Sequence, residues 1–145
     1  MRTLPFIAAA VLSLAPAFVP SARADEEAAE TCLRQKIWAG YSDGWAVRSA
    51  TKTTLAQGEH RVYMVTLYAG NEYKISACGD TMAANVDLVL YDGKGAQVIV
   101  DPSFDREPVI AYTPTATDTF YIAVHATQLN KADSKAGVAT ALTYK

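Results

Sequence analysis

Short runs with apolar residues at every second position, separated by turn residues, restrict the fold of this 145-residue sequence more than any other feature. In the clearest run, Tyr73, Ile75 and Ala77 alternate with polar residues, which is the period of a strand with one buried face. Asp92-Gly93 is a typical tight-turn pair between two such runs. The pattern predicts about eight strands, at residues 51–56, 61–68, 72–78, 86–91, 97–100, 108–112, 119–126 and 138–144. Because no helix of crossover length lies between them, we expect an all-β, antiparallel sandwich or barrel.

One helix is expected before the strands. Residues 25–41 carry acidic residues at their start and place Ala29, Leu33, Ile37 and Tyr41 four positions apart, so that one apolar stripe is predicted. We interpret this stripe as a face packed on the rest of the domain, and a helix that binds a partner is the alternative. Cys32 lies beside the stripe, which favours the packed helix.

The first 24 residues have the pattern of an export signal. Arg2 gives a positive start, an apolar stretch follows over 4–19, and Ala22-Arg23-Ala24 places small residues before a cut at Asp25. A membrane anchor is the alternative, but the stretch is short and contains internal prolines. The expected product is periplasmic or secreted. The predicted organisation is a leader at 1–24, a helical segment at 25–45 and a sandwich domain at 46–145.

Two cysteines, Cys32 and Cys78, remain after removal of this leader. In an oxidising compartment an isolated pair is most simply a disulfide, which here would contribute about 3–4 kcal/mol by restricting the unfolded chain. A metal or redox pair is the alternative, and the absence of a CxxC spacing disfavours it.

The charge of the processed chain disfavours some partners. Removal of residues 1–24 takes away Arg2 and Arg23, which leaves 11 basic and 15 acidic residues and a net charge of about −4. A mildly acidic protein of this kind is not expected to bind nucleic acid or an anionic membrane.

The order of motifs after Gly58 resembles the bacterial pre-peptidase C-terminal domain family. The motifs are the Tyr63-Val65-Leu67 run, Ala69-Gly70, Tyr73-Lys74-Ile75, Asp87 to Asp92 with Gly95, Ile110 to Pro114, and Thr119 to Val124. The resemblance implies a β-sandwich of jelly-roll type with a non-catalytic role, such as binding a substrate or matrix, assisting secretion, or folding with calcium. Asp118 departs from the family, which has a glycine there. Because only a helix precedes the domain, we expect a free-standing copy rather than a peptidase appendage.

Few residues are available for catalysis. The histidines are His60 and His125, and Ser103 is a candidate nucleophile, but a triad would require three unrelated segments to converge. The sequence contains no G-x-S-x-G turn, no phosphate-binding loop and no HExxH motif. We therefore predict that the protein is not an enzyme.

Aspartates suggest a possible calcium site. Asp87 lies in an apolar run, and Asp92 and Asp101 flank a predicted hairpin across which they could face each other. The alternative is that these aspartates serve turns and solubility. No cofactor is expected to be required, and calcium is the one candidate.

Aromatic residues without an evident packing role suggest a binding surface. These are Tyr41, Trp45 and Tyr68. We predict an exported, non-catalytic binding or accessory module that recognises a protein or polysaccharide in the cell envelope or outside the cell. The alternatives are a structural subunit of an envelope complex and a small secreted hydrolase.

Overall fold

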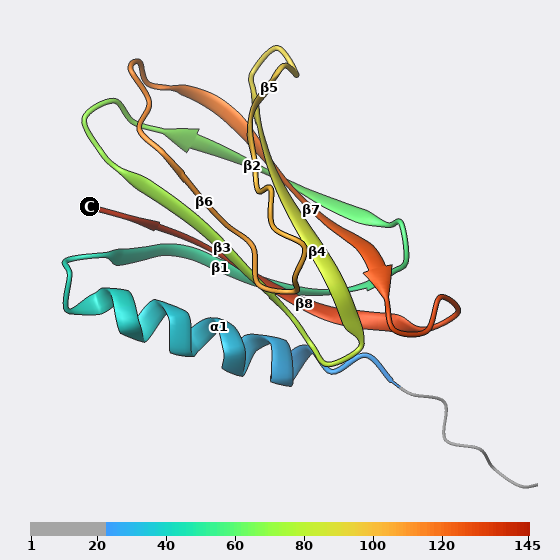
Figure 1. Cartoon of the computed structure of the whole chain (residues 1–145). Coiled ribbons are helices and arrows are strands. Elements are labelled where there is room, and N and C mark those ends of the chain that lie inside the picture. Colours follow the sequence, from blue (N-terminus) through green and yellow to red (C-terminus); the bar gives the residue numbers. More distant parts are fainter. Residues whose placement is uncertain (1–22) are drawn as a thin grey trace, which may run out of the picture.

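The computed structural model describes residues 23–145, so the predicted leader, apart from its last two residues, lies outside the described part of the chain. This part contains one helix and eight strands, and the strands form two packed sheets (Figure 1). Their bounds are α1 Glu26–Tyr41, β1 Ala46–Ala56, β2 His60–Leu67, β3 Tyr73–Gly79, β4 Ala83–Asp92, β5 Gln97–Val100, β6 Val109–Tyr112, β7 Asp118–Leu129 and β8 Lys135–Tyr144. The predicted all-β sandwich with one helix before it is confirmed.

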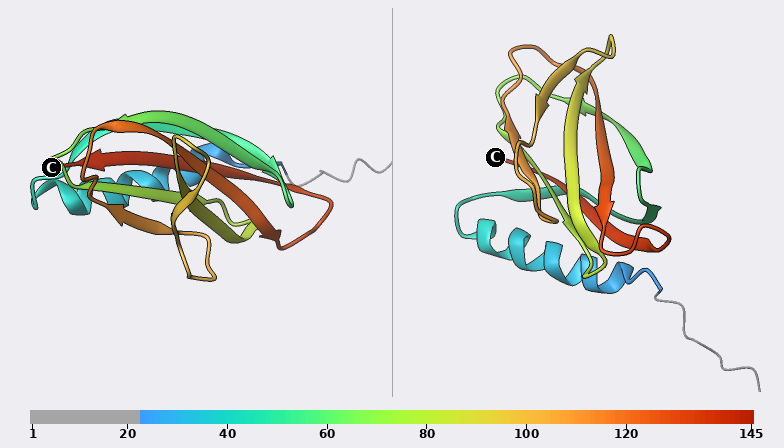
Figure 2. Two further views of the ribbon diagram at one scale, coloured as in Figure 1. Left: turned by 90° about the horizontal axis from the view of Figure 1, so that it is seen from above. Right: turned by 45° about the vertical axis from the view of Figure 1, so that its right-hand side comes forward.

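Successive strands alternate between the two sheets, except for the β4–β5 hairpin, which lies within one sheet. One sheet has the order β1-β8-β3-β6 and the other β2-β7-β4-β5, with every neighbouring pair antiparallel. This order is that of an eight-stranded jelly roll. The two sheets pack face to face around a shared core, and α1 covers the outer face of the first sheet (Figure 2).

The main core fills the space between the sheets. The inward positions are spaced by two along each strand, so Tyr73 and Ile75 of β3 meet residues such as Leu88, Leu90 and Ile122 from the opposite sheet. A second, smaller cluster lies between the helix and its sheet and is formed by Ala29, Leu33, Cys78, Ala139 and Ala141. The small residues of β8 let the helix approach closely.

The helix begins at a side-chain cap and ends in a glycine turn. The Asp25 carboxylate accepts a hydrogen bond from the backbone N–H of Ala28 at 2.9 Å, as expected of an N-cap residue. Ala29 and Leu33 of the predicted stripe are buried and Ile37 packs partly buried beside them, but Tyr41 is exposed because the helix extends beyond the sheet face there. Gly44, with φ of 87°, then allows the tight turn into β1.

Four strands are longer than the sequence pattern predicted. β1 begins at Ala46, because pairing with β8 holds residues that have no buried face of their own. β8 begins at Lys135 and β7 runs to Leu129, so only residues 130–134 separate two strands that were predicted to end at 126 and to begin at 138. Likewise β4 begins at Ala83, before the run predicted at 86–91. Asp118, which departs from the resembled family, starts β7 opposite Leu67.

Candidate functional site

The three predicted binding residues lie at one end of the molecule. This end is formed by the last turn of α1, the start of β1, the loop between β2 and β3, and the end of β8, beside the C-terminal label in Figure 1. Pairing of Ala46 and Tyr73 with Tyr144 brings these segments together. We call this region the aromatic end and define it by Trp38, Tyr41, Trp45, Arg48, Tyr68, Lys74 and Lys145.

The helix presents two stacked rings at the aromatic end. The Trp38 and Tyr41 ring centroids are 5.8 Å apart, with an angle of 8° between the ring planes. Trp38 is 77% exposed and Tyr41 is 69% exposed, which is unusual for large aromatic side chains on a packed helix. Sequence reasoning missed Trp38, although its spacing of three from Tyr41 places both residues on one side of a helix.

Cations lie over the other two rings. The Lys74 ammonium is 4.2 Å from the centroid of the Trp45 ring, and the Lys145 ammonium is 5.1 Å from it. The Arg48 guanidinium lies 5.2 Å from the centroid of the Tyr68 ring. Such contacts contribute about 0.5–1 kcal/mol each at exposed sites. They also fix long cationic side chains in place, so that positive charge and aromatic surface are presented together.

Arg48 also borders two hollows. One, of about 290 Å³, is lined by Arg48, Tyr68, Asn71, Tyr73 and Tyr144. There the Tyr73 hydroxyl accepts a hydrogen bond from the backbone N–H of Tyr68 at 2.9 Å. The other is a groove of about 360 Å³ between the edge strands β1 and β2. The Arg48 guanidinium spans its end by donating to the Thr66 carbonyl at 2.6 Å.

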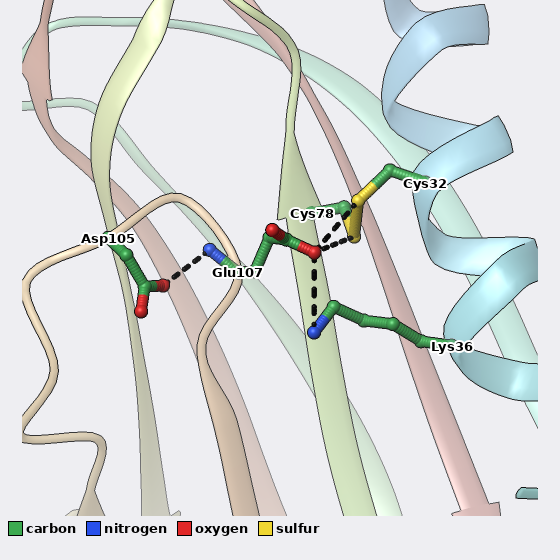
Figure 3. Close-up of a disulfide and its surroundings, with 5 residues drawn as sticks. All are labelled: Cys32, Lys36, Cys78, Asp105 and Glu107. Atoms are coloured by element: carbon green, nitrogen blue, oxygen red, sulfur yellow. Dashed lines mark hydrogen bonds and ion pairs between the residues drawn. A yellow bond between two sulfur atoms is a disulfide. The ribbon is translucent and has the colours of Figure 1, made fainter. Parts of the chain in front are cut away.

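The predicted disulfide is confirmed. Cys32 of α1 and Cys78 of β3 are bonded, with their Cα atoms 6.0 Å apart (Figure 3). The Glu107 carboxylate lies 3.3 Å from the Cys32 sulfur and 3.4 Å from the Lys36 ammonium, which brings the loop between β5 and β6 against the helix. Because both sulfurs are oxidised, neither has a proton to donate to Glu107, and the cluster is a structural tether between helix, strand and loop.

The structure does not bring the three calcium candidates together. The Asp92 carboxylate caps the β4–β5 turn by accepting from the N–H groups of Lys94 and Ala96. Asp101 is beyond the far end of β5, because the hairpin pairs Val89 with Val100. The expectation that Asp92 and Asp101 face each other across the hairpin is therefore wrong. The register of the two strands places one aspartate at the closed end and the other at the open end.

Asp101 and Asp87 each have local partners. Burial raises the pKa of Asp101, but hydrogen bonds from the Ser103 side chain and from the backbone N–H groups of Val109 and Ser103 outweigh it, so the pKa lies below its usual value. The Asp87 carboxylate accepts from Asn85 at 3.2 Å on the outer face of β4. Within residues 23–145, the group with closely spaced metal-ligand atoms is Cys32, Cys78 and Glu107, whose sulfurs form the disulfide.

The predicted catalytic alternative does not assemble. His60 and His125 face each other across β2 and β7, and their ring centroids are 5.1 Å apart. The pKa of His125 lies below its usual value, mainly because the side chain is partly buried and further because His60 repels its positive charge. The Asp87 carboxylate raises this pKa but does not outweigh the other two effects. The Ser103 hydroxyl donates to Asp101. In the described chain no hydrogen bond joins Ser103 to either histidine, and a serine nucleophile requires such a contact.

Comparison with known proteins identifies the fold type. No family model matches the sequence, and no curated protein is similar to it in sequence. Among solved structures, the pre-peptidase C-terminal domain of a collagenase from Bacillus anthracis superposes with a TM-score of 0.52 at 11% identity, over 66% of this chain and 89% of that domain. PliG from Aeromonas hydrophila, a periplasmic inhibitor of g-type lysozyme, gives a TM-score of 0.48 at 14% identity, over 71% of this chain and 90% of that one.

The first of these likenesses supports the fold implied by the sequence motifs, a sandwich like that of pre-peptidase C-terminal domains. Membership of that family stays a prediction. Within residues 23–145, no helix has both the length and the apolar character needed to cross a bilayer.

Proposed function

We propose that the protein is an exported, non-catalytic module that binds a partner protein through its aromatic end. The observation that carries this proposal is the combination of strongly exposed rings and fixed cations at one end of a compact sandwich. Trp, Tyr and Arg are the residue types most often found at the energetic centre of protein interfaces. An exposed aromatic cluster without such a role would lower solubility without benefit.

The ring geometry favours a protein over a polysaccharide. A sugar stacks on a free aromatic face, but Lys74 lies over the Trp45 ring and Arg48 lies over the Tyr68 ring. Cations held over rings are instead suited to carboxylates of an approaching protein, since Arg in particular binds carboxylates with two parallel hydrogen bonds. We therefore infer a partner whose contact surface carries exposed acidic side chains.

Export is the second part of the proposal. The sequence pattern at Ala22-Arg23-Ala24 supports cleavage before Asp25, and the disulfide between Cys32 and Cys78 supports an oxidising compartment. Mass spectrometry and N-terminal sequencing of the protein from the cell exterior or periplasm test this directly. Asp25 is the expected first residue, and a chain that keeps residues 1–24 in the cytoplasm would contradict it.

Binding measurements with a purified partner test the proposed surface. A partner identified by crosslinking in an envelope extract would be titrated against the wild-type chain and against Trp45→Ala, Tyr68→Ala and Lys74→Glu. We expect each substitution to raise the Kd by roughly tenfold or more, as substitutions at an interface centre do. Binding to a glycan array, with no protein partner, would replace the proposed protein by a polysaccharide.

Phe104→Ala is the matched control. Phe104 is an aromatic side chain with 71% exposure, comparable to Trp38 and Tyr41 of the aromatic end. It belongs to the loop between β5 and β6, which is bonded to Gly79 at the opposite end of β3. Its substitution is expected to leave the Kd unchanged. Equal losses for Phe104→Ala and Trp45→Ala would contradict the assignment of the surface.

A further inference from the structure

The carboxylate of Asp80 is buried beside the first residue of the helix segment. Asp80 is only 3% exposed, in the turn between β3 and β4. One of its oxygens, Oδ2, accepts hydrogen bonds from the backbone nitrogen of Asp25 at 2.7 Å and from that of Gly137 at 2.8 Å. The other, Oδ1, accepts from the N–H of Met82 at 2.9 Å. Every partner of this buried carboxylate is a backbone N–H group.

No ion pair of the described residues includes Asp80. A buried carboxylate without a cation carries a large desolvation penalty, which hydrogen bonds offset in part. A cation in place of one of the three donors would offset it further. Among the described residues the Asp80 carboxylate therefore has no positively charged partner. One of its three donors is the backbone nitrogen of Asp25, the first residue after the predicted leader.

The backbone of Asp25 packs tightly against Gly137 of β8, beside Asp80. A Cβ atom added at Gly137 would lie 2.5 Å from the Asp25 carbonyl carbon, so β8 must have glycine here for the chain to approach. The Asp25 carboxylate caps α1 by accepting from Ala28, and its carbonyl accepts from the N–H of Ala29 at 3.2 Å. These contacts hold residue 25, and with it its nitrogen, in one position against the sheet.

We propose that Asp80 is the binding site for the α-ammonium group of the processed chain. This inference rests on the export cleavage proposed above. Hydrolysis breaks the Ala24–Asp25 amide bond: water supplies the hydroxyl that completes the Ala24 carboxyl group, and the Asp25 nitrogen gains a proton from that water. At neutral pH the new amine takes up one more proton and becomes an ammonium group, 2.7 Å from the Asp80 oxygen.

The consequence is that processing stabilises the fold. In the uncleaved chain Asp80 has a neutral amide donor at this position, and in the cleaved chain it has a charged donor, which bonds a carboxylate more strongly. The folded state therefore gains an ion pair only after the leader has been removed. A precursor that is less stable than its product is suited to an export route that requires an unfolded chain.

Three chains that differ only at the N-terminus test the proposal. They are a chain beginning at Asp25 with a free amine, the same chain acetylated at that amine, and a chain beginning at Ala24. Acetylation keeps the N–H donor and removes the charge, whereas the Ala24 chain keeps the charge and moves it by one residue, about 3.8 Å. We expect the free Asp25 chain to melt about 3–6 °C above the other two.

The sign of the difference in melting temperature between the free and the acetylated Asp25 chain is diagnostic. A free positive charge at a helix N-terminus is unfavourable with respect to the helix dipole, so without Asp80 the acetylated chain should be the more stable one. Asp80→Asn is accordingly expected to abolish or reverse the difference between the free and acetylated chains. If Asp80→Asn does not fold, the comparison with the Ala24 chain decides, because it leaves Asp80 in place.

An acetylated chain or an Ala24 chain at least as stable as the free Asp25 chain would overturn the proposal. Purified chains with defined N-termini are compared, so this outcome does not depend on whether cells cleave the leader. N-terminal sequencing of the exported protein tests the cleavage separately. The two proposals can therefore fail independently of each other.

Discussion

At the scale of single residues, Gly137 has a role that no other residue can take. Its missing side chain makes room for the Asp25 backbone, and a Cβ atom would lie 2.5–2.6 Å from three atoms of residues 25 and 26. We expect Gly137→Ala to lower the free energy of unfolding by about 1–3 kcal/mol, because either β8 or the start of α1 must shift. Urea denaturation measures this change.

Gly40→Ala is the control for this prediction. Gly40 lies in the last turn of α1, where an added Cβ would have ordinary contacts of 3.6 Å with Trp45. Alanine is the better helix former, so the same substitution should here stabilise by up to about 1 kcal/mol. A Gly137→Ala protein as stable as the wild type would show that the helix start does not rest on β8 as the structure has it.

A second residue-scale prediction concerns pH. Burial and the neighbouring His60 hold the pKa of His125 below 6.5, against the opposing effect of Asp87. The unfolded chain therefore takes up a proton on His125 before the folded chain does, and stability is lost as the pH falls below about 6.5. The loss in Tm between pH 7 and pH 5 should be smaller for His125→Gln than for the wild type. Identical losses in the two proteins would contradict this assignment.

At the scale of elements, the attachment of α1 depends on one covalent bond and a small apolar cluster. Cys32→Ala removes the bond to Cys78 and opens a loop of 46 positions. We expect a loss of about 3–4 kcal/mol in the free energy of unfolding, together with faster hydrogen exchange in α1 than in β4 and β7. These two strands belong to the other sheet and do not contact the helix cluster.

Lys36→Ala provides the matched control for the tether. It removes the ion pair with Glu107 beside the disulfide and leaves the sulfur bond intact. Because both partners of this pair are partly exposed, the expected loss is below about 1 kcal/mol. Equal stability of Cys32→Ala and the wild type under oxidising conditions would contradict the role assigned to the disulfide.

The elements also show which parts of the structure could be read from the sequence. β3 was predictable because Tyr73, Ile75 and Ala77 face one core, and a two-residue period records that burial directly. The first part of β1 was not, since Ala46 to Ala50 are exposed and only pairing with β8 makes them a strand. Pairing between distant segments leaves no local signal.

The candidate sites likewise differ in how far the sequence could predict them. Cys32 and Cys78 were predictable as a bridge because only two cysteines exist. The calcium candidates depended on the register of a hairpin, in which Val89 pairs with Val100 and the register shifts between Leu90 and Tyr91. The aromatic end was partly predictable: the lack of an evident packing role marked Tyr41, Trp45 and Tyr68, but the cations over the rings depend on the fold.

At the scale of the whole molecule, the two ends of the sandwich have different roles. One end holds the start of α1 against Asp80 and Gly137, where tight packing and hydrogen bonds stabilise the fold. The other end presents the rings and cations, which contribute little to the core and remain available for contact. This separation lets substitutions at the aromatic end change binding while the fold stays intact.

Site-specific photo-crosslinking in cells that export the protein tests binding at the aromatic end most directly. A photoreactive amino acid would replace Tyr68 in one strain and Phe104 in another, because both side chains are exposed and the two lie at different ends of the sandwich. We predict a discrete crosslinked protein from position 68, absent from position 104 and lost when Lys74→Glu is added. Crosslinking of equal yield at both positions, or a product at position 68 that survives Lys74→Glu, would contradict the account.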